Sequence, residues 1–234
     1  MAAKIAQLEG GTAAVLTGSG QAANVYAMFN IGPCGGHIIG TAEIYGGTFN
    51  LLATTMKQMG IETTFVPNNC SDDMLRGAFR PNTKLVIGET ISNPSLSVLD
   101  IERFARMAHE HGVPLIVDNT FATPINCRPF EWGADIVTHS TTKYMDGHAA
   151  TVGGVIVDSG TFDWTKYPDT FPGLTRPDES YHGLVYAERF GLGGAYITKA
   201  VAHLMRDLGS VQGPINDYML NRGLARRPPR GQGQ

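Results

Sequence analysis

Lys143 has the sequence setting most suggestive of chemistry. It directly follows three hydroxyl residues, Ser140, Thr141 and Thr142, and no acidic residue lies within two positions of it. A lysine amine that forms an imine must be partly deprotonated, and removal from water beside other cations has that effect. Neighbouring hydroxyl groups can bind a phosphate through short hydrogen bonds. Two alternatives are a solvated surface lysine and the S-x-x-K motif of serine acyltransferases, whose companion motifs S-D-N and K-T-G are absent.

Asp118 ends the apolar run at 114–117 and is followed by Asn119 and Thr120. A carboxylate at the carboxyl end of a buried strand lies where open α/β sheets bind their ligands. Because a buried carboxylate is costly unless it meets a cation, a protonated pyridine nitrogen is one natural partner. The alternative is that Asp118 only caps the turn that contains Asn119 and Thr120.

The segment 18–23, Gly-Ser-Gly-Gln-Ala-Ala, follows one predicted strand and opens a predicted helix. A glycine turn at a helix N-terminus offers free N–H groups and the positive end of the helix dipole, which both suit a phosphate. The segment also matches the dinucleotide pattern G-x-G-x-x-A, and Glu43 follows about twenty residues later, at the end of the next strand. These residues alone leave open a phosphate site, a nicotinamide-dinucleotide site and a purely connecting turn.

Tyr45 follows the next predicted strand and precedes two glycines. An aromatic ring in that position can lie flat against a planar ligand, or it can simply pack within the turn. His139 and His148 flank Lys143, but neither has further ligands at metal-binding spacing, so no metal site is predicted.

Strands and helices that alternate along the first two thirds of the chain must position these residues. Short apolar runs predict strands at 13–16, 38–41, 61–66, 84–88, 114–117, 134–138 and 154–157. Helical patterns predict helices at 21–29, 48–59, 71–79, 101–111 (with Asp100 as its N-cap) and 197–208. Because the strand runs do not alternate in polarity, we expect helices on both faces of the sheet and an α/β fold. Residues 159–195, rich in Gly, Pro and aromatic residues, predict a long, ordered surface loop.

The composition argues against several classes of protein. The chain has 234 residues, 42% hydrophobic and 17% charged, as is usual for a globular protein of one or two domains. A net charge of −3 argues against nucleic acid or an anionic membrane as a partner, and no run of about twenty apolar residues could span a bilayer. Three widely spaced cysteines without a C-x-x-C pair, and no apolar export signal after Met1, predict a cytoplasmic protein.

Taken together, the motifs resemble the Cys/Met metabolism family of pyridoxal-phosphate (PLP)-dependent enzymes. The lysine signature of that family is satisfied from Asp135 to His148, and only Ala149 departs from its last position. Further similar segments are SGQAA (19–23), EIYGGT (43–48), ETISNP (89–94) and VDNTFATP (117–124). The stretch 171–183 most closely resembles the O-acetylhomoserine sulfhydrylase branch. The resemblance covers residues 1 to about 221 and displaces the dinucleotide interpretation, since a nicotinamide enzyme has no use for Lys143 and Asp118 in these positions.

The resemblance implies three layers, αβα, in the aspartate-aminotransferase-like large domain of fold type I. Residues 1–221 would form a partial PLP-binding large domain, truncated at both ends, because the N-terminal arm and the C-terminal domain of the family are missing from this sequence. Residues 222–234 hold four arginines and no acidic residue, and their Arg/Pro/Gly-rich composition predicts a disordered tail.

The resemblance also implies a role for each candidate residue. Lys143 would bind PLP covalently and later move protons, while Asp118 would pair with the pyridinium nitrogen. Tyr45 would stack on the ring and assist the leaving group. Asn93 would contact the 3-hydroxyl oxygen of the ring, with Glu89 close by. The phosphate would be held by backbone N–H groups and by hydroxyl groups, namely those of Gly20 and Gln21 and those of Ser140 and Thr142.

The activity implied by the resemblance is γ-replacement in methionine biosynthesis and transsulfuration. O-acetyl-L-homoserine would exchange its acetate for sulfide or a thiol, giving homocysteine or a methionine-type product. A PLP-dependent lyase acting on methionine or cystathionine and a non-catalytic PLP-binding fragment are alternatives, and a dinucleotide-binding oxidoreductase is a more remote one. Since members of the family share active sites between subunits, the resemblance implies a homo-oligomer, a homotetramer built as a dimer of dimers.

Overall fold

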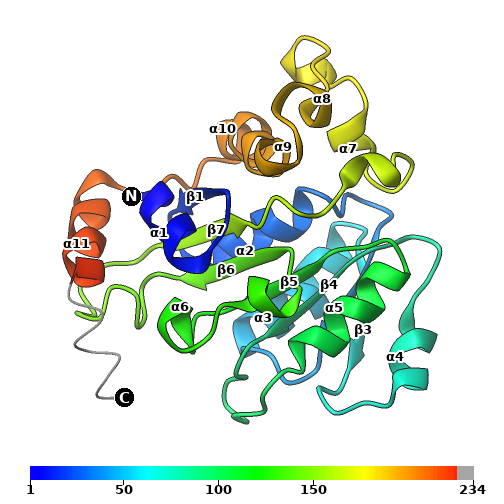
Figure 1. Ribbon diagram of the computed structural model, residues 1–234, viewed down its shortest axis with the longest axis horizontal. Coiled ribbons are helices and arrows are strands. Elements are labelled where there is room, and N and C mark those ends of the chain that lie inside the picture. The colour runs from blue at the N-terminus through cyan, green and yellow to red at the C-terminus, as the bar shows by residue number, and fades with distance from the viewer. Residues whose placement is uncertain (226–234) are drawn as a thin grey trace.

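A seven-stranded mixed sheet forms the centre of the computed structural model, which describes residues 1–225 (Figure 1). The strand order is β1-β7-β6-β5-β4-β2-β3. Strands β2 to β6 are parallel, whereas β7 runs antiparallel to β6 and β1 runs antiparallel to β7. The strands are β1 (Ala13–Thr17), β2 (His37–Thr41), β3 (Glu62–Val66), β4 (Thr83–Glu89), β5 (Leu115–Asp118), β6 (Ile136–Ser140) and β7 (Gly154–Asp158). All seven predicted strands are present, with bounds that differ by at most two residues.

The central strands are buried on both sides. Leu85, Val86 and Ile87 in β4 and Ile116 and Val117 in β5 have no exposed surface. Branched and bulky apolar side chains fit a pleated surface that helices cover on each face, and such strands read as unbroken apolar runs. The α/β class predicted from these runs is confirmed.

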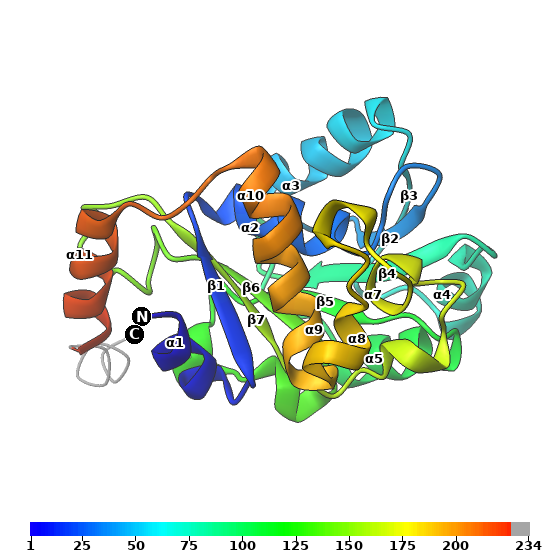
Figure 2. The ribbon, with the colours of Figure 1, turned by 90° about the horizontal axis from the view of Figure 1, so that it is seen from above.

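Hydrogen bonds from neighbouring residues of β6 show that helices lie on both faces of the sheet. Thr138 Oγ1 donates to Asn24 Oδ1 in α2 (2.6 Å), whereas His139 Nε2 is hydrogen-bonded to Glu9 Oε1 in α1. Because successive residues of a strand point to opposite faces, α1 and α2 cover opposite faces. The predicted three-layer αβα arrangement is present, and Figures 1 and 2 show the helices around the sheet.

Helices α2, α4 and α5 begin where the sequence supplies a side-chain cap. Ser71 Oγ accepts from the Met74 N–H (3.2 Å) at the start of α4, and Asp100 Oδ1 accepts from the Arg103 N–H (3.1 Å) at the start of α5, so the predicted N-cap at Asp100 is confirmed. The helix predicted at 48–59 begins earlier, with α3, and continues as the π-helical segment η1. The remaining bounds are α1 (Ala2–Glu9), α2 (Gly20–Phe29), α3 (Gly46–Asn50), η1 (Leu51–Met56), α4 (Asp72–Ala78), α5 (Ile101–Glu110), α6 (Thr123–Asn126), η2 (Pro129–Trp132), η3 (Trp164–Lys166), α7 (Pro172–Thr175), η4 (Glu179–Tyr181), α8 (Tyr186–Phe190), α9 (Leu192–Lys199), η5 (Ala200–Met205), α10 (Arg206–Leu208) and α11 (Pro214–Ala225). None of them is both long and apolar enough to traverse a bilayer.

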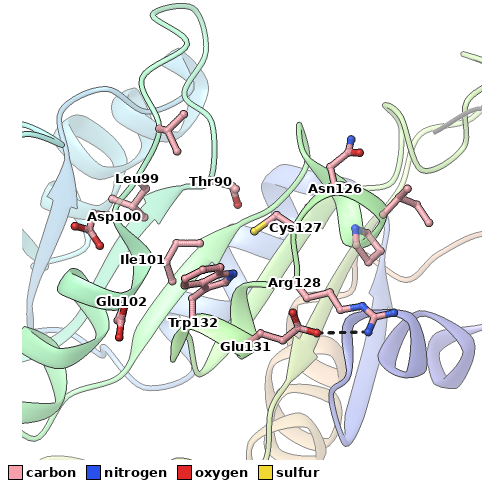
Figure 3. Close-up of a pocket in the computed structure, with 13 residues that line it drawn as sticks. Thr90, Leu99, Asp100, Ile101, Glu102, Asn126, Cys127, Arg128, Glu131 and Trp132 are labelled. Atoms are coloured by element: carbon pink, nitrogen blue, oxygen red, sulfur yellow. Dashed lines mark ion pairs between the residues drawn. The ribbon is translucent and has the colours of Figure 1, made fainter. Parts of the chain in front are cut away.

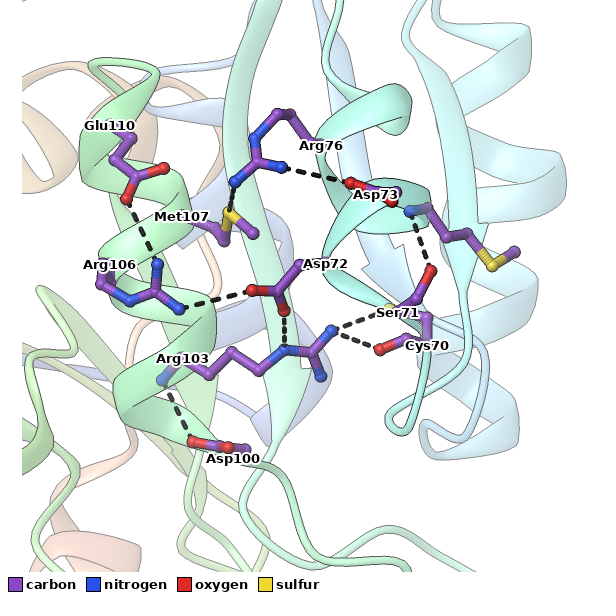
Figure 4. Close-up of polar contacts among 11 residues, drawn as sticks. Cys70, Ser71, Asp72, Asp73, Arg76, Asp100, Arg103, Arg106, Met107 and Glu110 are labelled. Carbon is purple, nitrogen blue, oxygen red and sulfur yellow. Dashed lines mark hydrogen bonds and ion pairs between the residues drawn. The ribbon is translucent and has the colours of Figure 1, made fainter.

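A polar cluster joins α4 to α5 (Figure 4). Arg103 Nε donates to Asp72 Oδ1 (2.6 Å), and a second nitrogen of the same guanidinium bonds the Cys70 carbonyl. Arg106 approaches the other oxygen of Asp72 at 3.7 Å. These bonds hold the first turn of α4 against α5.

The prediction of a surface loop at 159–195 is wrong for much of that segment. The segment contains α7, α8 and the start of α9, and it buries Trp164 and Tyr186 almost completely. Trp164 stacks on Tyr196 of α9, with ring centroids 5.5 Å apart, and the Tyr196 hydroxyl donates to the Ala27 carbonyl of α2 (2.7 Å). Large aromatic side chains gain more from burial than the Gly and Pro content costs, so the segment packs against α9 as short helices.

The boundary predicted at 221/222 does not mark the end of regular structure. Helix α11 runs to Ala225, so the first residues of the predicted tail are helical, and the others lie outside the described residues. Leu220 and Leu224, four residues apart on one helical face, are buried in a small cluster with Ile5 of α1. The burial of this apolar pair extends the helix past the predicted boundary.

Candidate functional site

Several candidate residues meet at the carboxyl edge of the parallel strands. Glu89 ends β4, Asp118 ends β5 and Ser140 ends β6. The strand register pairs Glu89 with Asp118 and Asp118 with Thr138. Gly20 begins α2 and lies against β6, since a Cβ atom added at Gly20 would lie 2.4 Å from the Ser140 Cβ atom. Residues that are far apart in the sequence therefore share one edge of the sheet.

The first turn of α2 presents backbone donors to this edge. The Ser19 hydroxyl oxygen accepts from the Ala22 N–H (3.1 Å) and caps the helix. The N–H groups of Gly20 and Gln21 have no partner within the helix and lie at the positive end of its dipole. The Gln21 side chain donates to the Gly47 carbonyl (3.0 Å) and so fixes the neighbouring loop. This arrangement suits a phosphate group, as the roles predicted for Gly20 and Gln21 require.

The two predicted hydroxyl donors differ in their hydrogen bonds. The Thr142 hydroxyl donates to the Gly153 carbonyl (3.2 Å) and accepts from the Gly153 N–H (3.1 Å). Its single proton is therefore in use, and Thr142 fixes the segment around Gly153. The Ser140 hydroxyl faces Gly20 and makes no hydrogen bond to the described residues. Ser140 therefore has a proton to offer a phosphate, and the same role for Thr142 stays a prediction.

Asp118 is 8% exposed, and its two oxygens have different partners. Oδ1 accepts from the Thr120 N–H (3.0 Å) and the Thr120 hydroxyl (2.5 Å), which is the capping arrangement expected as the alternative. Oδ2 accepts one bond, from Asn24 Nδ2 (3.0 Å), and retains a further acceptor position. One carboxylate can therefore cap the turn and also accept a ring N–H.

Asn24 is part of the site and was missed in the sequence. It is 2% exposed and donates from Nδ2 to both Asp118 Oδ2 and Thr48 Oγ1 (3.3 Å), while its Oδ1 accepts from Thr138. The acceptor and donor contacts together fix the orientation of the amide. The available signal was its position four residues after Gly20, which puts both residues on the same face of α2.

Glu89 is buried beside Asp118 and touches two loops. Burial, followed by the Asp118 charge, raises the pKa of Glu89 to about 8, against opposing backbone hydrogen bonds from Asn93 and Tyr45. The Asn93 N–H donates to Glu89 Oε2 at 3.1 Å. The Tyr45 side chain is 50% exposed, and its ring lies over Gly47. The structure thus holds the backbones of Tyr45 and Asn93 close to Glu89.

Lys143 lies in the turn directly after β6. Its N–H donates to the Ser140 carbonyl (3.2 Å), which ties the residue to the end of the strand. The side chain is exposed, so the described residues do not remove it from water as the sequence argument expected. Tyr144 beside it meets Phe121 edge to face, with centroids 5.5 Å apart.

The residues that follow β4 and β5 point to the opposite face of the sheet. Thr90 Oγ1 donates to Asn119 Oδ1 (2.8 Å), and Asn119 Nδ2 donates to Glu9 Oε1 (3.1 Å). A cavity of about 670 Å³ opens on that face, lined by Thr90, Cys127 and Trp132 among others (Figure 3). This cavity lies across the sheet from the candidate site.

The other motif residues have structural contacts. Glu43, the acid expected of a dinucleotide site, accepts from the Asn68 N–H (2.8 Å). Within residues 1–225, no three His, Cys, Asp or Glu side chains are grouped so that they could hold a metal ion.

Comparison with known proteins decides between the interpretations of this site. The model of the Cys/Met metabolism PLP-dependent enzyme family matches residues 1–230. The chain belongs to this family. The resemblance inferred from the motifs is confirmed, with PLP as the cofactor, and the dinucleotide interpretation of the segment 18–23 is wrong.

Relatives in this family are enzymes of sulfur amino-acid synthesis. The homocysteine/cysteine synthase of Kluyveromyces lactis is 44% identical over 230 residues, which cover 98% of this chain and 51% of that protein. The O-acetyl-L-homoserine sulfhydrylase of Corynebacterium glutamicum is 43% identical over 225 residues, which cover 94% of this chain and 51% of that protein. The chain spans about half the length of the curated relatives it matches.

Solved structures confirm the fold. An O-acetylhomoserine (thiol)-lyase of Campylobacter jejuni superposes with a TM-score of 0.92 at 32% identity, over 97% of this chain and 55% of that one. That structure carries N′-pyridoxyl-lysine-5′-monophosphate. The O-acetylhomoserine sulfhydrylase of Wolinella succinogenes superposes with a TM-score of 0.84 at 31% identity, over 96% of this chain and 61% of that one.

The residues at the sheet edge fit PLP by their own geometry. The close approach of Gly20 to Ser140 puts the backbone donors of the first turn of α2 next to the Ser140 hydroxyl, as a phosphate site needs. Asp118 Oδ2 keeps an acceptor position for a protonated ring nitrogen. The turn that carries Lys143 follows Ser140 directly, so an amine, a phosphate cradle and a carboxylate lie at the same edge.

Proposed function

We propose that the chain is the cofactor-binding part of an enzyme that exchanges the acetate of O-acetyl-L-homoserine for sulfide or a thiol. The observation that carries the proposal is the convergence of a phosphate cradle, formed by Gly20 and Ser140, with the buried carboxylate of Asp118. This convergence occurs in a chain that is 44% identical to homocysteine/cysteine synthases.

The described residues would hold and orient the cofactor. The N–H groups of Gly20 and Gln21 and the Ser140 hydroxyl bind the phosphate, and thereby set the ring against Asp118. The Asp118 charge stabilises the protonated ring nitrogen. When bound, PLP supplies an electron sink for the negative charge that a substrate carbon acquires on losing a proton.

Lys143 and Tyr45 would act in the reaction itself. Lys143 would hold the cofactor through its amine Nζ, and when that amine is free it would take the α proton and move protons between substrate carbons. Proton transfer by a positioned side chain contributes about 10²–10⁴-fold to the rate. Tyr45 would stack on the cofactor ring and assist the leaving group.

Covalent labelling tests the cofactor assignment. Borohydride reduction of the PLP-loaded chain should fix a pyridoxyl group on the peptide that contains Lys143, as read by mass spectrometry. Lys143→Ala should still collect PLP through the phosphate cradle but should lose the visible absorbance of the lysine-bound cofactor. A label on Lys166 or Lys199 instead would overturn the assignment.

The acetate-release assay tests the reaction. With O-acetyl-L-homoserine, acetate release that depends on added sulfide and is matched by homocysteine formation supports replacement. Release of ammonia and an oxo acid without sulfide would show a lyase instead. Stoichiometric PLP binding with neither product would show a non-catalytic PLP-binding fragment.

The assembly and the location of the protein are part of the same proposal. The three cysteines among the described residues are unpaired, which supports a reducing compartment and a place in the cytoplasm. Exposed apolar side chains on α11, including Ile215 and Tyr218, support association with further copies of the chain into a homo-oligomer, a tetramer in the complete protein. Sedimentation of the complete protein as a monomer would contradict the homo-oligomer.

A further inference from the structure

We propose that Glu89, at the end of β4, is a positioning residue. Its carboxyl group holds together the backbones of two loops, the Tyr45 loop (residues 42–45, after β2) and the Asn93 loop (residues 90–100, after β4). The proposal rests on the proposed function only for the meaning of these two loops, since Tyr45 and Asn93 are the residues assigned to the cofactor ring.

The contacts that carry the inference converge on one side chain. Glu89 Oε2 accepts from the Asn93 N–H (3.1 Å), and a backbone hydrogen bond from Tyr45 reaches the same carboxyl group. Glu89 is 7% exposed and is the register partner of Asp118 on the neighbouring strand. Strand β4 therefore fixes the position of Glu89. Asp118 lies on one side of it, and the Tyr45 and Asn93 loops lie on the other.

The two loops do not need Glu89 in order to fold. The Asn93 loop is closed by the Ser92 N–H donating to the Ser97 carbonyl (2.9 Å), and the Thr48 N–H donates to the Tyr45 carbonyl (2.8 Å) at the start of α3. Glu89 instead bonds the backbone of the residues that reach the site. Its loss should therefore displace Tyr45 and Asn93 relative to Asp118 without unfolding either loop.

The protonation state of Glu89 is consistent with this role. Two ionised carboxylates side by side in a buried setting repel each other, and burial together with the Asp118 charge keeps Glu89 protonated at neutral pH. Among the described residues, Asp118 on β5 is the titratable group whose charge acts on Glu89, and Tyr45 meets Glu89 through its backbone. A neutral acid still has an oxygen that accepts N–H groups, so Glu89 can position the loops without adding a second negative charge.

Amide hydrogen exchange of the cofactor-free chain tests the inference independently of PLP and of the proposed reaction. Glu89→Ala should speed exchange of the Tyr45 and Asn93 amides by about tenfold, the effect expected for one lost hydrogen bond, while Glu89→Gln keeps a carbonyl acceptor and should change both rates far less. Asp158→Asn is the matched control, because Asp158 is also a buried acid that accepts a backbone N–H, from Gly160 (2.9 Å), at the opposite edge of the sheet.

The outcomes separate this inference from the proposed function. Faster exchange at both amides in Glu89→Ala, with Asp158→Asn unchanged at those positions, supports the positioning role whatever the enzyme does. Unchanged exchange at Tyr45 and Asn93 in Glu89→Ala overturns it, even if Lys143 carries the label. Should Glu89→Ala not fold, the amide proton shifts of the Glu89→Gln chain decide: movement of both supports a shared acceptor, and movement of neither overturns it.

Discussion

At the residue scale, Asp118 shows how one side chain serves both the fold and the site. Its Oδ1 atom caps the turn at Thr120, and its Oδ2 atom is aimed by Asn24. The cap uses Oδ1, and a partner for a ring nitrogen would use Oδ2, so the two interpretations that the sequence left open are compatible. The cap fixes the orientation in which Oδ2 would meet the ring.

Asn24→Ala should weaken both the fold and the cofactor site. The substitution removes the donor to Asp118 and leaves the buried Thr138 hydroxyl without its acceptor, so we expect a loss of roughly 1–3 kcal/mol in the free energy of unfolding. PLP affinity and turnover should also fall, because Asp118 loses its orientation. Urea unfolding and PLP titration measure the two effects.

Asn30→Ala is the matched control for that variant. Asn30 directly follows α2, at the end opposite to the site. It is likewise buried, and it donates to the Tyr196 carbonyl (2.9 Å). It should cost similar stability and leave PLP affinity unchanged. Equal losses of PLP affinity in the two variants would show that Asn24 acts only through general stability.

Glu89 should give the chain a distinctive dependence of stability on pH. Burial beside Asp118 raises the pKa of Glu89 from 4.5 to about 8 in the folded chain. The stabilisation that this proton provides is complete below the unfolded pKa and is lost as the pH rises through the folded pKa. Relative to Glu89→Gln, the wild type should therefore lose stability between these two values, by up to about 1.4 kcal/mol per pH unit.

Urea unfolding of both chains at several pH values in that window measures the difference. Asp158, whose pKa burial raises to about 7, titrates in both chains and cancels in the comparison. A difference between wild type and Glu89→Gln that stays constant with pH would contradict the raised pKa.

Residue types and motif spacing predicted the candidate residues that the structure brings to one edge of the sheet. The sequence indicates Lys143 by the run of hydroxyl residues before it, Asp118 by its position at a strand end, and Gly20 by its glycine turn. Asn24 and the double contact of Glu89 could not be predicted, because they depend on which side chains of separate elements meet across the sheet edge. The bonding of the Thr142 hydroxyl to Gly153 depends likewise on a loop whose path the sequence does not define.

At the element scale, the strand ends and the N-terminus of α2 place the site, and the sequence predicted both. The strands were recognisable because buried parallel strands read as unbroken apolar runs. The segment 159–195 was mispredicted because its short helices are stabilised by aromatic burial against α9 rather than by helical periodicity.

Gly20→Ala tests the contact between α2 and β6. An added Cβ atom would lie 2.4–2.8 Å from Ser140 atoms, including its backbone Cα, so helix or strand must shift. We expect a loss of roughly 1–3 kcal/mol in the free energy of unfolding and a weaker phosphate cradle, seen as a higher dissociation constant for PLP.

Gly77→Ala is the control for Gly20→Ala, because Gly77 lies in α4 with open space around it. Its replacement should stabilise the chain by about 0.5–1 kcal/mol, through the higher helix propensity of alanine. A Gly20→Ala chain that binds PLP as tightly as the wild type would rule out the cradle.

At the scale of the whole molecule, the sheet brings segments separated by more than a hundred residues to one edge, so a ligand bound there stabilises the entire fold. PLP should therefore raise the melting temperature. At a concentration about a hundred times the dissociation constant, the gain is roughly 2.7 kcal/mol, or about 5–10 °C for a chain of this size.

Pyridoxal, which lacks the phosphate, should give a smaller shift if the contact of α2 with β6 forms the cradle. Lys143→Ala should keep the part of the shift that the phosphate provides, and a Lys143→Ala chain that melts at the same temperature with and without PLP would show that the cradle contributes no binding of its own.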